Sequence, residues 1–333
     1  MVVRLPGLTR CLRWGSQWVL AMALGWGFAP AQSSALDAED TGGSIAVAYP
    51  DIAEPYRSAF ASILQGIDER SRGRVSHVAI PTDAAAASAV VDELRHRRPR
   101  ALVALGRGGL KVANSLDRQG LVLVGGVLSV PEADAQSFWV QSLAPDPALL
   151  FARLKGLAPQ VRRVVVVYDP KQSEWLIRLA REAARSHGLE LLTVEAEDLK
   201  AAWRRYQELL GSLNPKRDAL WLPQDTSTVD DTTVLPWLLR EAWDQGLVVF
   251  SSNLAHVRRG ALFALYPDNL ELGRHLGTTV QALLSTHGSG APTPRGLQPL
   301  RQVLMAVNTR TAEHLGLDLR ASGQRIHLAL PEQ

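Results

Sequence analysis

The chain is poor in cysteine, since Cys11 is the only one among its 333 residues. A lipoprotein carries its cysteine at the end of an apolar leader, whereas Cys11 precedes the apolar stretch, so lipid anchoring is not expected. A single cysteine also excludes an intramolecular disulfide and a cysteine-based metal site. Such a chain is compatible with an oxidising compartment, although it cannot form a disulfide within itself there.

Motifs for catalysis and for metal binding are lacking as well. The eight histidines show no ligand spacing and no His-Glu-x-x-His, and neither a Gly-x-Ser-x-Gly elbow nor a Walker sequence occurs. Asp225, Asp230 and Asp231 lie close together, but the last two stand where a helix N-terminus favours acids. We therefore expect no catalytic residue, no metal and no cofactor. A periplasmic enzyme with Asp225 and Asp268 as an acid/base pair is an alternative that no motif supports.

The first 31 residues contain no acidic residue. Three arginines precede the uncharged run "WGSQWVLAMALGWGFAPA", which ends in small residues. This order predicts a signal peptide over residues 1–31, with cleavage after Ala31 or Ala35, and a periplasmic mature protein. An uncleaved membrane anchor is the alternative, but glycines, polar residues and a proline dilute the apolar run.

Removal of this segment changes the charge of the chain. It subtracts three arginines and no acid, so the formal net charge falls from +3 to 0. Proteins that bind nucleic acids carry a concentrated basic footprint. We therefore expect no nucleic-acid partner.

Short apolar runs alternate with helical patterns in two consecutive sets. The first set has runs at 44–50, 75–80, 101–106 and 121–128, with helices expected over 51–68 and 84–96. The second has runs at 162–169, 190–196, 218–224 and 247–253, with helices near 173–187, 198–213 and 232–245. Nearly continuous apolar runs indicate parallel strands that are covered on both faces. The pattern predicts an α/β protein with two doubly wound parallel-sheet lobes and a ligand cleft between them.

The remaining residues do not form a third set. They contain a strand-like run at 260–267, a helix over 270–285, a Gly/Pro-rich connector at 286–296 and a last strand at 301–308. We therefore assign the first lobe to 44–142 plus 268–297, and the second lobe to 143–267 plus 298–333.

The stretch "LVALGRGGLKVANSL" lacks two parts of a dinucleotide fingerprint. Gly106 and Gly108 fit, but Lys111 stands at the third glycine position, and no acid follows the next strand. A strand-to-helix turn of this kind still presents backbone N–H groups to an anion. Arg107, with backbone donors at Gly108 and Gly109, is therefore a candidate clamp for an anionic ligand group. The alternatives are a solvated arginine, or one that pairs with a cleft carboxylate in a site that no longer binds.

The second half resembles a known family. The segments that carry the resemblance are "VRRVVVVYDPKQSEWLIRLAREAARSHGLEL", "DALWLPQDTSTV", "VVFSSNLAHVRRGALFALYPDNLELGRHLGTTVQALL" and "AVNTRTAEHLGLDL". They resemble ABC-transporter substrate-binding proteins with a type I periplasmic binding fold, and the resemblance covers most of 44–320. It implies two lobes that close over a small ligand, an amino acid in characterised members, aromatic ones among them. It also implies delivery of that ligand to a membrane permease.

The resemblance carries over unevenly to single residues. The family's Pro-x-Asp strand end matches at Asp225, with Thr226 next to it, and its helix start matches at Asp268. Asn253, at another strand end, is expected to meet a cationic or polar ligand group together with Asp225. In the first lobe, Arg107 stands where family members often place a hydroxyl after the third strand.

Two tryptophans are candidates to stack on a ligand. Trp175 follows the first strand of the second set, and Trp139 lies near the predicted lobe crossover. Trp203, Trp237 and Trp243 lie within helical patterns and are expected to pack in the core.

These features together predict an exported solute-binding protein that captures a small anionic or amino-acid-like ligand for an ABC importer. We expect it to be a monomer whose partner is an ABC permease. The alternative, slightly favoured by the departures in the first lobe, is a periplasmic sensory module that reports its ligand to a membrane signalling partner.

Overall fold

The computed structural model describes residues 45–71, 75–116, 120–286 and 295–331. The predicted signal peptide and most of the predicted connector at 286–296 lie outside the described residues. Within the described part of the chain, no helix is long and apolar enough to cross a membrane.

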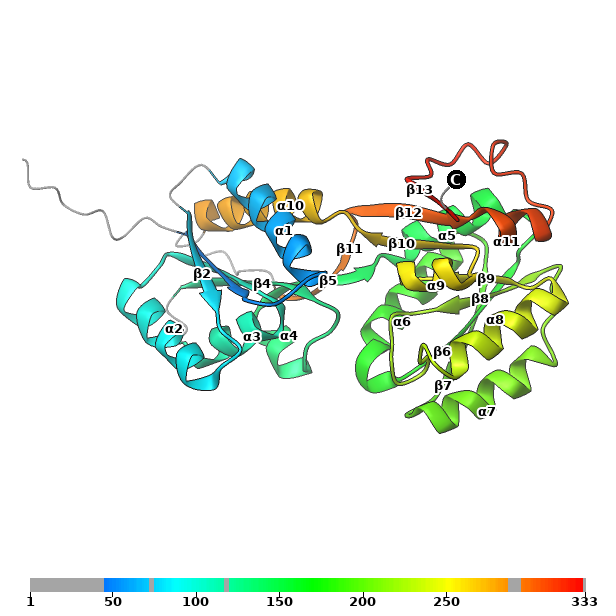
Figure 1. The fold of residues 1–333 in the computed structure, drawn as a ribbon, viewed down its shortest axis with the longest axis horizontal. Helices are drawn as coiled ribbons and strands as arrows, with labels where there is room; N and C mark the ends of the chain where they lie inside the picture. The colour runs from blue at the N-terminus through cyan, green and yellow to red at the C-terminus, as the bar shows by residue number, and fades with distance from the viewer. Residues whose placement is uncertain (1–44, 72–74, 117–119, 287–294, 332–333) are drawn as a thin grey trace, which may run out of the picture. The chain divides into compact units, whose positions relative to one another are not determined.

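Six strands form a sheet in the first lobe (Figure 1). They are β1 (Ile45–Pro50), β2 (Val75–Ile80), β3 (Ala101–Leu105), β4 (Leu121–Val127), β5 (Trp139–Pro145) and β11 (Gly296–Leu300). Their order is β11-β5-β4-β3-β1-β2, and every neighbouring pair is parallel. The carboxyl ends of these strands therefore share one edge of the sheet.

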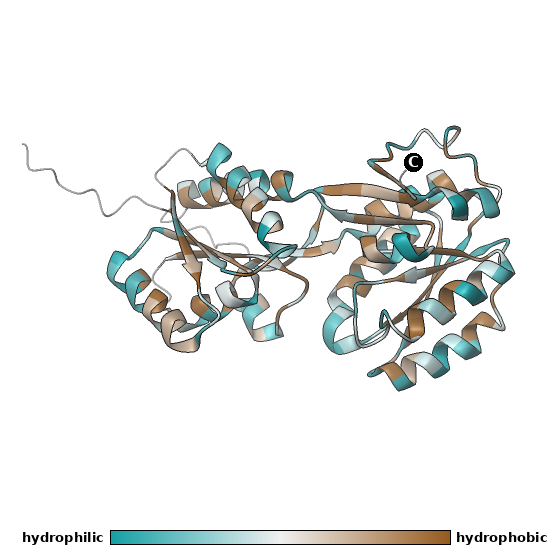
Figure 2. Ribbon diagram, in the orientation of Figure 1, coloured by the Kyte–Doolittle hydropathy of each residue, from teal (hydrophilic) through white to brown (hydrophobic). Residues whose placement is uncertain are grey.

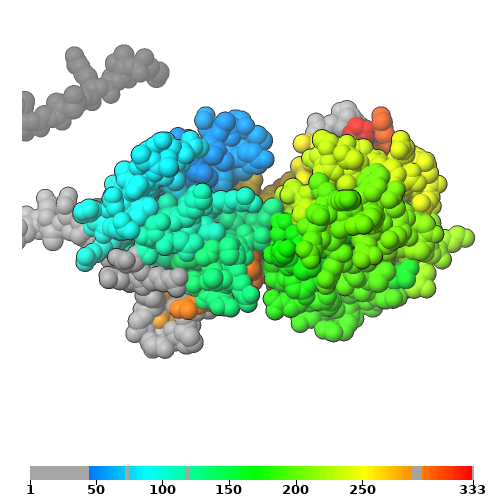
Figure 3. Space-filling view, turned by 90° about the horizontal axis from the view of Figure 1, so that it is seen from below, coloured from blue at the N-terminus to red at the C-terminus, as the bar shows by residue number. Residues whose placement is uncertain are grey.

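Helices cover both faces of this sheet. They are α1 (Tyr56–Arg70), α2 (Ala84–Arg97), α3 (Gly106–Ser115), α4 (Glu132–Ser137) and α10 (Asn269–Thr286). Ile67 of α1 and Leu276 of α10 are buried with Val47 and Val103 of the strands in one hydrophobic cluster. A second cluster joins α2 and α3 to other strand residues. In the space-filling view, α2 and the segments after it, coloured cyan to green, cover the visible side of the lobe (Figure 3).

Seven strands form the second sheet. They are β6 (Arg163–Tyr168), β7 (Glu190–Glu195), β8 (Asp218–Leu222), β9 (Val248–Ser251), β10 (Phe263–Pro267), β12 (Val303–Asn308) and β13 (Leu328–Leu330). Their order is β13-β12-β10-β9-β8-β6-β7. All neighbouring pairs are parallel except β10 and β12, which are antiparallel.

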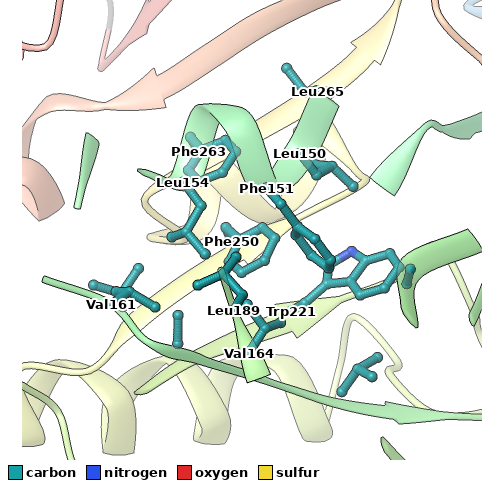
Figure 4. Close-up of a cluster of buried hydrophobic side chains, with 14 of the residues drawn as sticks. Leu150, Phe151, Leu154, Val161, Val164, Leu189, Trp221, Phe250, Phe263 and Leu265 are labelled. Carbon is teal, nitrogen blue, oxygen red and sulfur yellow. The ribbon is translucent and has the colours of Figure 1, made fainter. Parts of the chain in front are cut away.

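Helices surround this sheet too. They are α5 (Pro147–Leu157), α6 (Pro170–Ser186), α7 (Leu199–Leu210), α8 (Val234–Gln245), α9 (Leu254–Arg259) and α11 (Thr309–His314). On one face, Phe151 meets Trp221 edge to face at 5.8 Å, and Phe250 stacks on Phe263 at 5.2 Å between ring centroids (Figure 4). Apolar residues concentrate on the strands and on one side of several helices, with hydrophilic residues on the other side (Figure 2). The prediction of two α/β lobes built on parallel sheets is confirmed.

Some element bounds differ from the predicted ones. α1 begins at Tyr56 rather than near residue 51, because Pro55 restricts the backbone of the residue before it. α6 begins at Pro170, three residues earlier than expected. Asp169 caps it by accepting from the N–H of Lys171 at 3.0 Å, and proline is favoured at the first helical position.

Candidate functional site

A cavity of about 990 Å³ opens in the first lobe. Pro50, Ile80, Gly106 and Gly126 line it, and they lie at or next to the carboxyl ends of β1, β2, β3 and β4. Open α/β sheets bind their ligands at this edge. The cavity is large enough for a small organic molecule.

Apolar side chains form much of the cavity wall. Besides the strand ends they include Ile52, Tyr56, Phe60, Val91 and Val112. Tyr56 is 66% exposed, which is unusual for a large aromatic side chain of this protein. A surface of this kind binds the apolar part of a ligand by removing it from water.

Two glycines make room for the ring of Phe60. Gly106 and Gly126 have φ of +69° and +70°, a region that side chains other than glycine rarely adopt. A Cβ atom at either position would lie 3.3 Å from the Phe60 ring. Phe60 therefore lies over two glycines at the strand ends and contributes to the cavity wall.

Two cationic side chains on α3 line the same cavity. Arg107 and Lys111 are four residues apart, so they lie on one side of the helix, and both are exposed. Within the described ranges, neither the guanidinium of Arg107 nor the ammonium of Lys111 has a hydrogen bond or an ion pair, although the backbone carbonyl of Lys111 accepts from the hydroxyl of Ser115 at 2.9 Å. Arg95 also lines the cavity, but its guanidinium is engaged by Asp92 at 2.9 Å and by the carbonyl of Ser115 at 2.7 Å.

No acidic residue occurs among the described residues that line the cavity. Like charges four residues apart on a helix destabilise it by a few tenths of a kcal/mol, about 0.2–0.5. An anion between Arg107 and Lys111 would remove this repulsion. The geometry therefore favours a negatively charged ligand group at this point.

The first turn of α3 adds backbone donors. Leu105 stands at the N-cap and its side chain makes no capping hydrogen bond. The first N–H groups of a helix have no partner within it. Gly108 lines the cavity, whereas Gly109 is buried, and a Cβ there would lie 2.7 Å from the carbonyl carbon of Ala104. Gly109 thus allows α3 to pack closely on β3, and it is not a lining residue.

In the second lobe, Asp225 is held inside a loop. Its side chain is 3% exposed. Oδ2 accepts from the N–H of Asp169 at 3.0 Å, and Oδ1 accepts from the N–H of Ser227 at 2.9 Å. The Ser227 hydroxyl lies 2.5 Å from Asp225 Oδ1 and 3.0 Å from Asp169 Oδ2. Asp225 therefore joins the ends of β8 and β6, a role that differs from direct contact with a ligand.

Two other expected ligand residues begin helices. Asn253 caps α9, since its Oδ1 accepts from the N–H of Ala255 at 3.0 Å. Asp268 precedes α10, and its Oδ1 accepts from the N–H of Glu271 at 3.1 Å. Within the part of the chain that the structure describes, the amide nitrogen of Asn253 donates no hydrogen bond.

The remaining expected residues lie in different surroundings. Thr226 is exposed at the end of β8, and no hydrogen bond of its side chain occurs within the described residues. Trp175 is partly buried against the cluster around Phe151 and Trp221. Trp139 is 8% exposed and belongs to a core cluster of the first lobe, so its prediction as a ligand-stacking residue was wrong.

Asp230 and His256 lie near the start of α8 and in α9. Asp230 accepts from the N–H groups of Thr233 and Val234 at 2.9 and 2.7 Å. Burial raises the pKa of Asp230, but hydrogen bonds from Thr232, Val234 and Thr233 outweigh this and hold it at about 2. The expectation that this acid serves a helix N-terminus is confirmed.

A serine, a histidine and an aspartate form a second polar cluster. His256 Nδ1 lies 2.8 Å from the hydroxyl of Ser251, and its Nε2 lies 3.8 Å from Asp231. The Ser251 hydroxyl donates to the carbonyl of Leu222 at 3.1 Å and is completely buried. A substrate cannot reach this hydroxyl, so the cluster is structural and not a catalytic triad.

Sequence reasoning missed Tyr56, Phe60 and Lys111 as cavity residues. The available signal was their spacing, since Tyr56 and Phe60, like Arg107 and Lys111, are four residues apart on a helix that follows a strand. Among the described residues, no group of three or more His, Cys, Asp or Glu side chains could hold a metal ion.

Comparison with known proteins identifies the family. The sequence model of the ABC transporter substrate binding protein family matches residues 152–321. The chain belongs to this family. The members of this family bind small molecules and work with ABC permeases. The family is therefore one of solute-binding proteins and not one of enzymes. No curated protein sequence matches the chain.

Solved structures are similar in fold. The ligand-free, open structure of a substrate binding protein with adhesive properties from Clostridium difficile has a TM-score of 0.61 at 15% identity, over 87% of this chain and 99% of that one. An ABC domain in complex with L-Trp from Streptococcus pneumoniae has a TM-score of 0.53 at 14% identity, over 87% and 100%. A conserved domain protein from Vibrio cholerae O1 biovar El Tor has 0.52 at 18%, over 86% and 99%. The fold is thus that of type I periplasmic binding proteins.

Proposed function

We propose that this substrate-binding protein captures an organic anion with an apolar body and delivers it to an ABC permease. The observation that carries the proposal is that Arg107 and Lys111 line the same cavity. Neither side chain has a hydrogen-bond or ion-pair partner among the described residues, and no acidic residue is among those that line the cavity. The apolar wall around Phe60 supports the second half of the proposal.

The chemistry of the two cations suits carboxylates and phosphates. A guanidinium binds either group through two parallel hydrogen bonds, and an ammonium binds it as a point charge. The Streptococcus pneumoniae neighbour is in complex with L-Trp, which has a carboxylate and an aromatic body. In the second lobe, the exposed Thr226, the amide nitrogen of Asn253 and the partly exposed Trp175 are proposed to complete the site when the lobes close.

Export belongs to the same proposal. We propose that residues 1–31 direct the chain to the periplasm, where it acts as a monomer. The mass of the protein recovered from the periplasm tests this, because cleavage after Ala31 or Ala35 leaves a chain that begins at Gln32 or Leu36. Recovery of the full-length chain in the membrane fraction would contradict it.

Isothermal titration calorimetry of the mature protein tests ligand capture. Aromatic and branched carboxylates, small dicarboxylates and organic phosphates form the panel. A hydrogen bond to a charged group contributes about 1.5–3 kcal/mol, so Arg107→Ala is expected to weaken the best ligand at least about tenfold. Arg97→Ala is the matched control, since Arg97 is exposed on α2, where it forms an ion pair with Glu93, and it does not line the cavity. The proposal fails if no anion binds, or if Arg107→Ala binds like the wild type.

A further inference from the structure

We infer that the ligand is an unbranched organic acid whose chain lies in a groove between α2 and α3. This inference rests on the proposed capture of an anion in the first-lobe cavity, and it names the class of substrate more narrowly, as a straight-chain carboxylate. The cavity has a volume of about 990 Å³, at the upper end of the roughly 300–1,000 Å³ of small-molecule sites. Its shape follows from the residues that line it.

One side of the cavity is a face of α2. The residues of this helix that line it are Ala84, Ala87, Ser88, Val91 and Arg95. Spacings of three and four residues relate them, so they lie on the same side of the helix over about three turns. At a rise of 1.5 Å per residue, the stretch from Ala84 to Arg95 is about 16 Å long.

The opposite side of the cavity is a face of α3. The residues of this helix that line it are Arg107, Gly108, Lys111, Val112 and Ser115, again at helical spacing. The stretch from Arg107 to Ser115 is about 12 Å long. Because α2 follows β2 and α3 follows β3, the groove between the two helices starts at the carboxyl ends of these strands.

Arg95 closes the far end of the groove. Its Nη2 donates to the carbonyl of Ser115 at 2.7 Å and thereby joins α2 to α3. Its Nη1 donates to Asp92 at 2.9 Å. Since this guanidinium is engaged, we expect the carboxylate of the ligand at Arg107, in the first turn of α3, and its chain between the helices in the direction of Arg95.

The groove between these two ends is apolar and narrow. Val91 and Val112 line it, and both are buried in the core cluster on this face of the sheet. Packed helices lie about 8–10 Å apart, so a groove between two of them is long but not wide. A straight chain of methylene groups fits such a groove, whereas a branched body of the same volume does not.

Acids that differ only in shape test the inference by titration calorimetry of the mature protein. Octanoate and 2-propylpentanoate are isomers of equal charge, and octanoate is expected to bind at least about tenfold more tightly, because each buried methylene tightens binding about fourfold. In the series butanoate, hexanoate, octanoate and decanoate, the Kd is expected to fall at least about twofold per methylene, since the groove stays partly open to water. 1-Octanol, which lacks the carboxylate, is expected not to bind.

The outcomes separate the inference from the proposed function. If 2-propylpentanoate or 3-phenylpropanoate binds as tightly as octanoate, the inference is overturned while capture of an anion stands. The same holds if the Kd does not change with chain length. If no organic anion binds, or if 1-octanol binds as tightly as octanoate, the proposed function fails and the inference fails with it.

A bulky side chain in the groove tests where the chain of the ligand lies. Ser88→Phe places a ring in the groove, and Ala89→Phe places the same ring at an exposed position of α2 that does not line the cavity. Ser88→Phe is expected to lower the Kd ratio of hexanoate to decanoate at least about fivefold, because the last methylenes are no longer buried. Ala89→Phe should leave this ratio within about twofold of the wild type, since an exposed ring away from the groove buries no part of the ligand. A wild-type ratio in Ser88→Phe would mean that the chain lies against Tyr56 and Phe60 instead, which overturns the inference.

Discussion

The carboxylate of Asp225 accepts a hydrogen bond from the backbone N–H of Asp169 at 3.0 Å, although 56 positions separate the two residues. Asp169 follows β6 and Asp225 follows β8, which are neighbours in the second sheet. Ser227 closes the arrangement by donating to Asp225 from its N–H. Asp225, which sequence reasoning assigned to ligand binding, thus holds the loop that contains Thr226 in place.

Replacement of Asp225 by alanine is expected to destabilise the protein. A hydrogen bond to a charged group contributes about 1.5–3 kcal/mol, and buried donors on Asp169 and Ser227 would be left unpaired. We expect the free energy of unfolding to fall by at least about 2 kcal/mol, measured by urea denaturation followed by tryptophan fluorescence. Thr226→Ala, at an exposed neighbouring position, should stay within about 0.5 kcal/mol of the wild type. An Asp225→Ala protein of unchanged stability that has lost its ligand would instead make Asp225 a ligand residue.

The ion pair between Arg163 and Asp218 is expected to matter for stability. Asp218 is fully buried, and its oxygens accept from Arg163 at 3.0 and 2.6 Å. Loss of one partner from a buried pair costs about 3–5 kcal/mol. Because the Arg163 side chain is 23% exposed, Asp218→Asn should lower the free energy of unfolding by an amount near the lower end of this range. Lys171→Ala breaks a pair in which both side chains are 76% exposed, and it should cost less than about 1 kcal/mol.

The same pair has a predictable pH dependence. Burial raises the pKa of Asp218, but the hydrogen bonds from Arg163 and Asn214 outweigh it, so the pKa lies below its ordinary value of 3.8. The stabilisation is therefore present above pH 4 and is lost as the pH falls further. Urea denaturation at pH 3 should show a smaller difference between the wild type and Asp218→Asn than at pH 6. A difference that grows on acidification would contradict this account.

The strands could be predicted because their signal is local. The run "RVVVVY" of β6 is almost completely buried, as parallel strands covered on both faces require. α5 was missed because its buried residues Leu150, Phe151, Leu154 and Leu157 leave little polar contrast around the helix. The antiparallel pairing of β12 with β10 could not be read either, since an apolar run does not encode the direction of its neighbour.

The sequence predicts the site only where a recognisable turn follows a strand. Arg107 was found because it interrupts a glycine-rich turn after a strand. Asp225, Asn253 and Asp268 were selected because polar residues at strand ends bind ligands, but the same residue types cap helices and tie loops. Only three-dimensional contacts distinguish these roles, which is why the sequence assigned all three to the ligand.

Close packing of α1 on α10 is expected to tolerate no side chain at Gly273. A Cβ atom there would lie 2.1 Å from the carbonyl oxygen of Ile63, whereas one at Gly277 would lie 2.9 Å from that of Ile67. Both atoms belong to the backbone, so the helices must separate. Overpacking costs about 1–3 kcal/mol or more, and Gly273→Ala should lower the free energy of unfolding more than Gly277→Ala. Thermal unfolding measures the order, with the exposed Thr278→Ala as control; equal midpoints for all three variants would refute it.

The buried ring of His256 should make the protein less stable in mild acid. Burial lowers the pKa of His256 to about 4 from an ordinary value of 6.5; Asp231 opposes this shift and Arg259 adds to it. Between pH 6.5 and pH 4, His256 is therefore mostly protonated in the unfolded chain and mostly neutral in the folded protein.

Stability from this histidine is fully present above pH 6.5 and is lost as the pH falls toward 4, by about 2 kcal/mol at pH 5. Replacement by glutamine removes the titrating group, so His256→Gln should lose less stability than the wild type between pH 7.5 and pH 5. Urea denaturation at the two pH values measures both losses, and circular dichroism at pH 7.5 checks that the variant is folded. Equal losses in the two proteins would mean that the ring is protonated without cost, which its 4% exposure and its contact with Ser251 argue against.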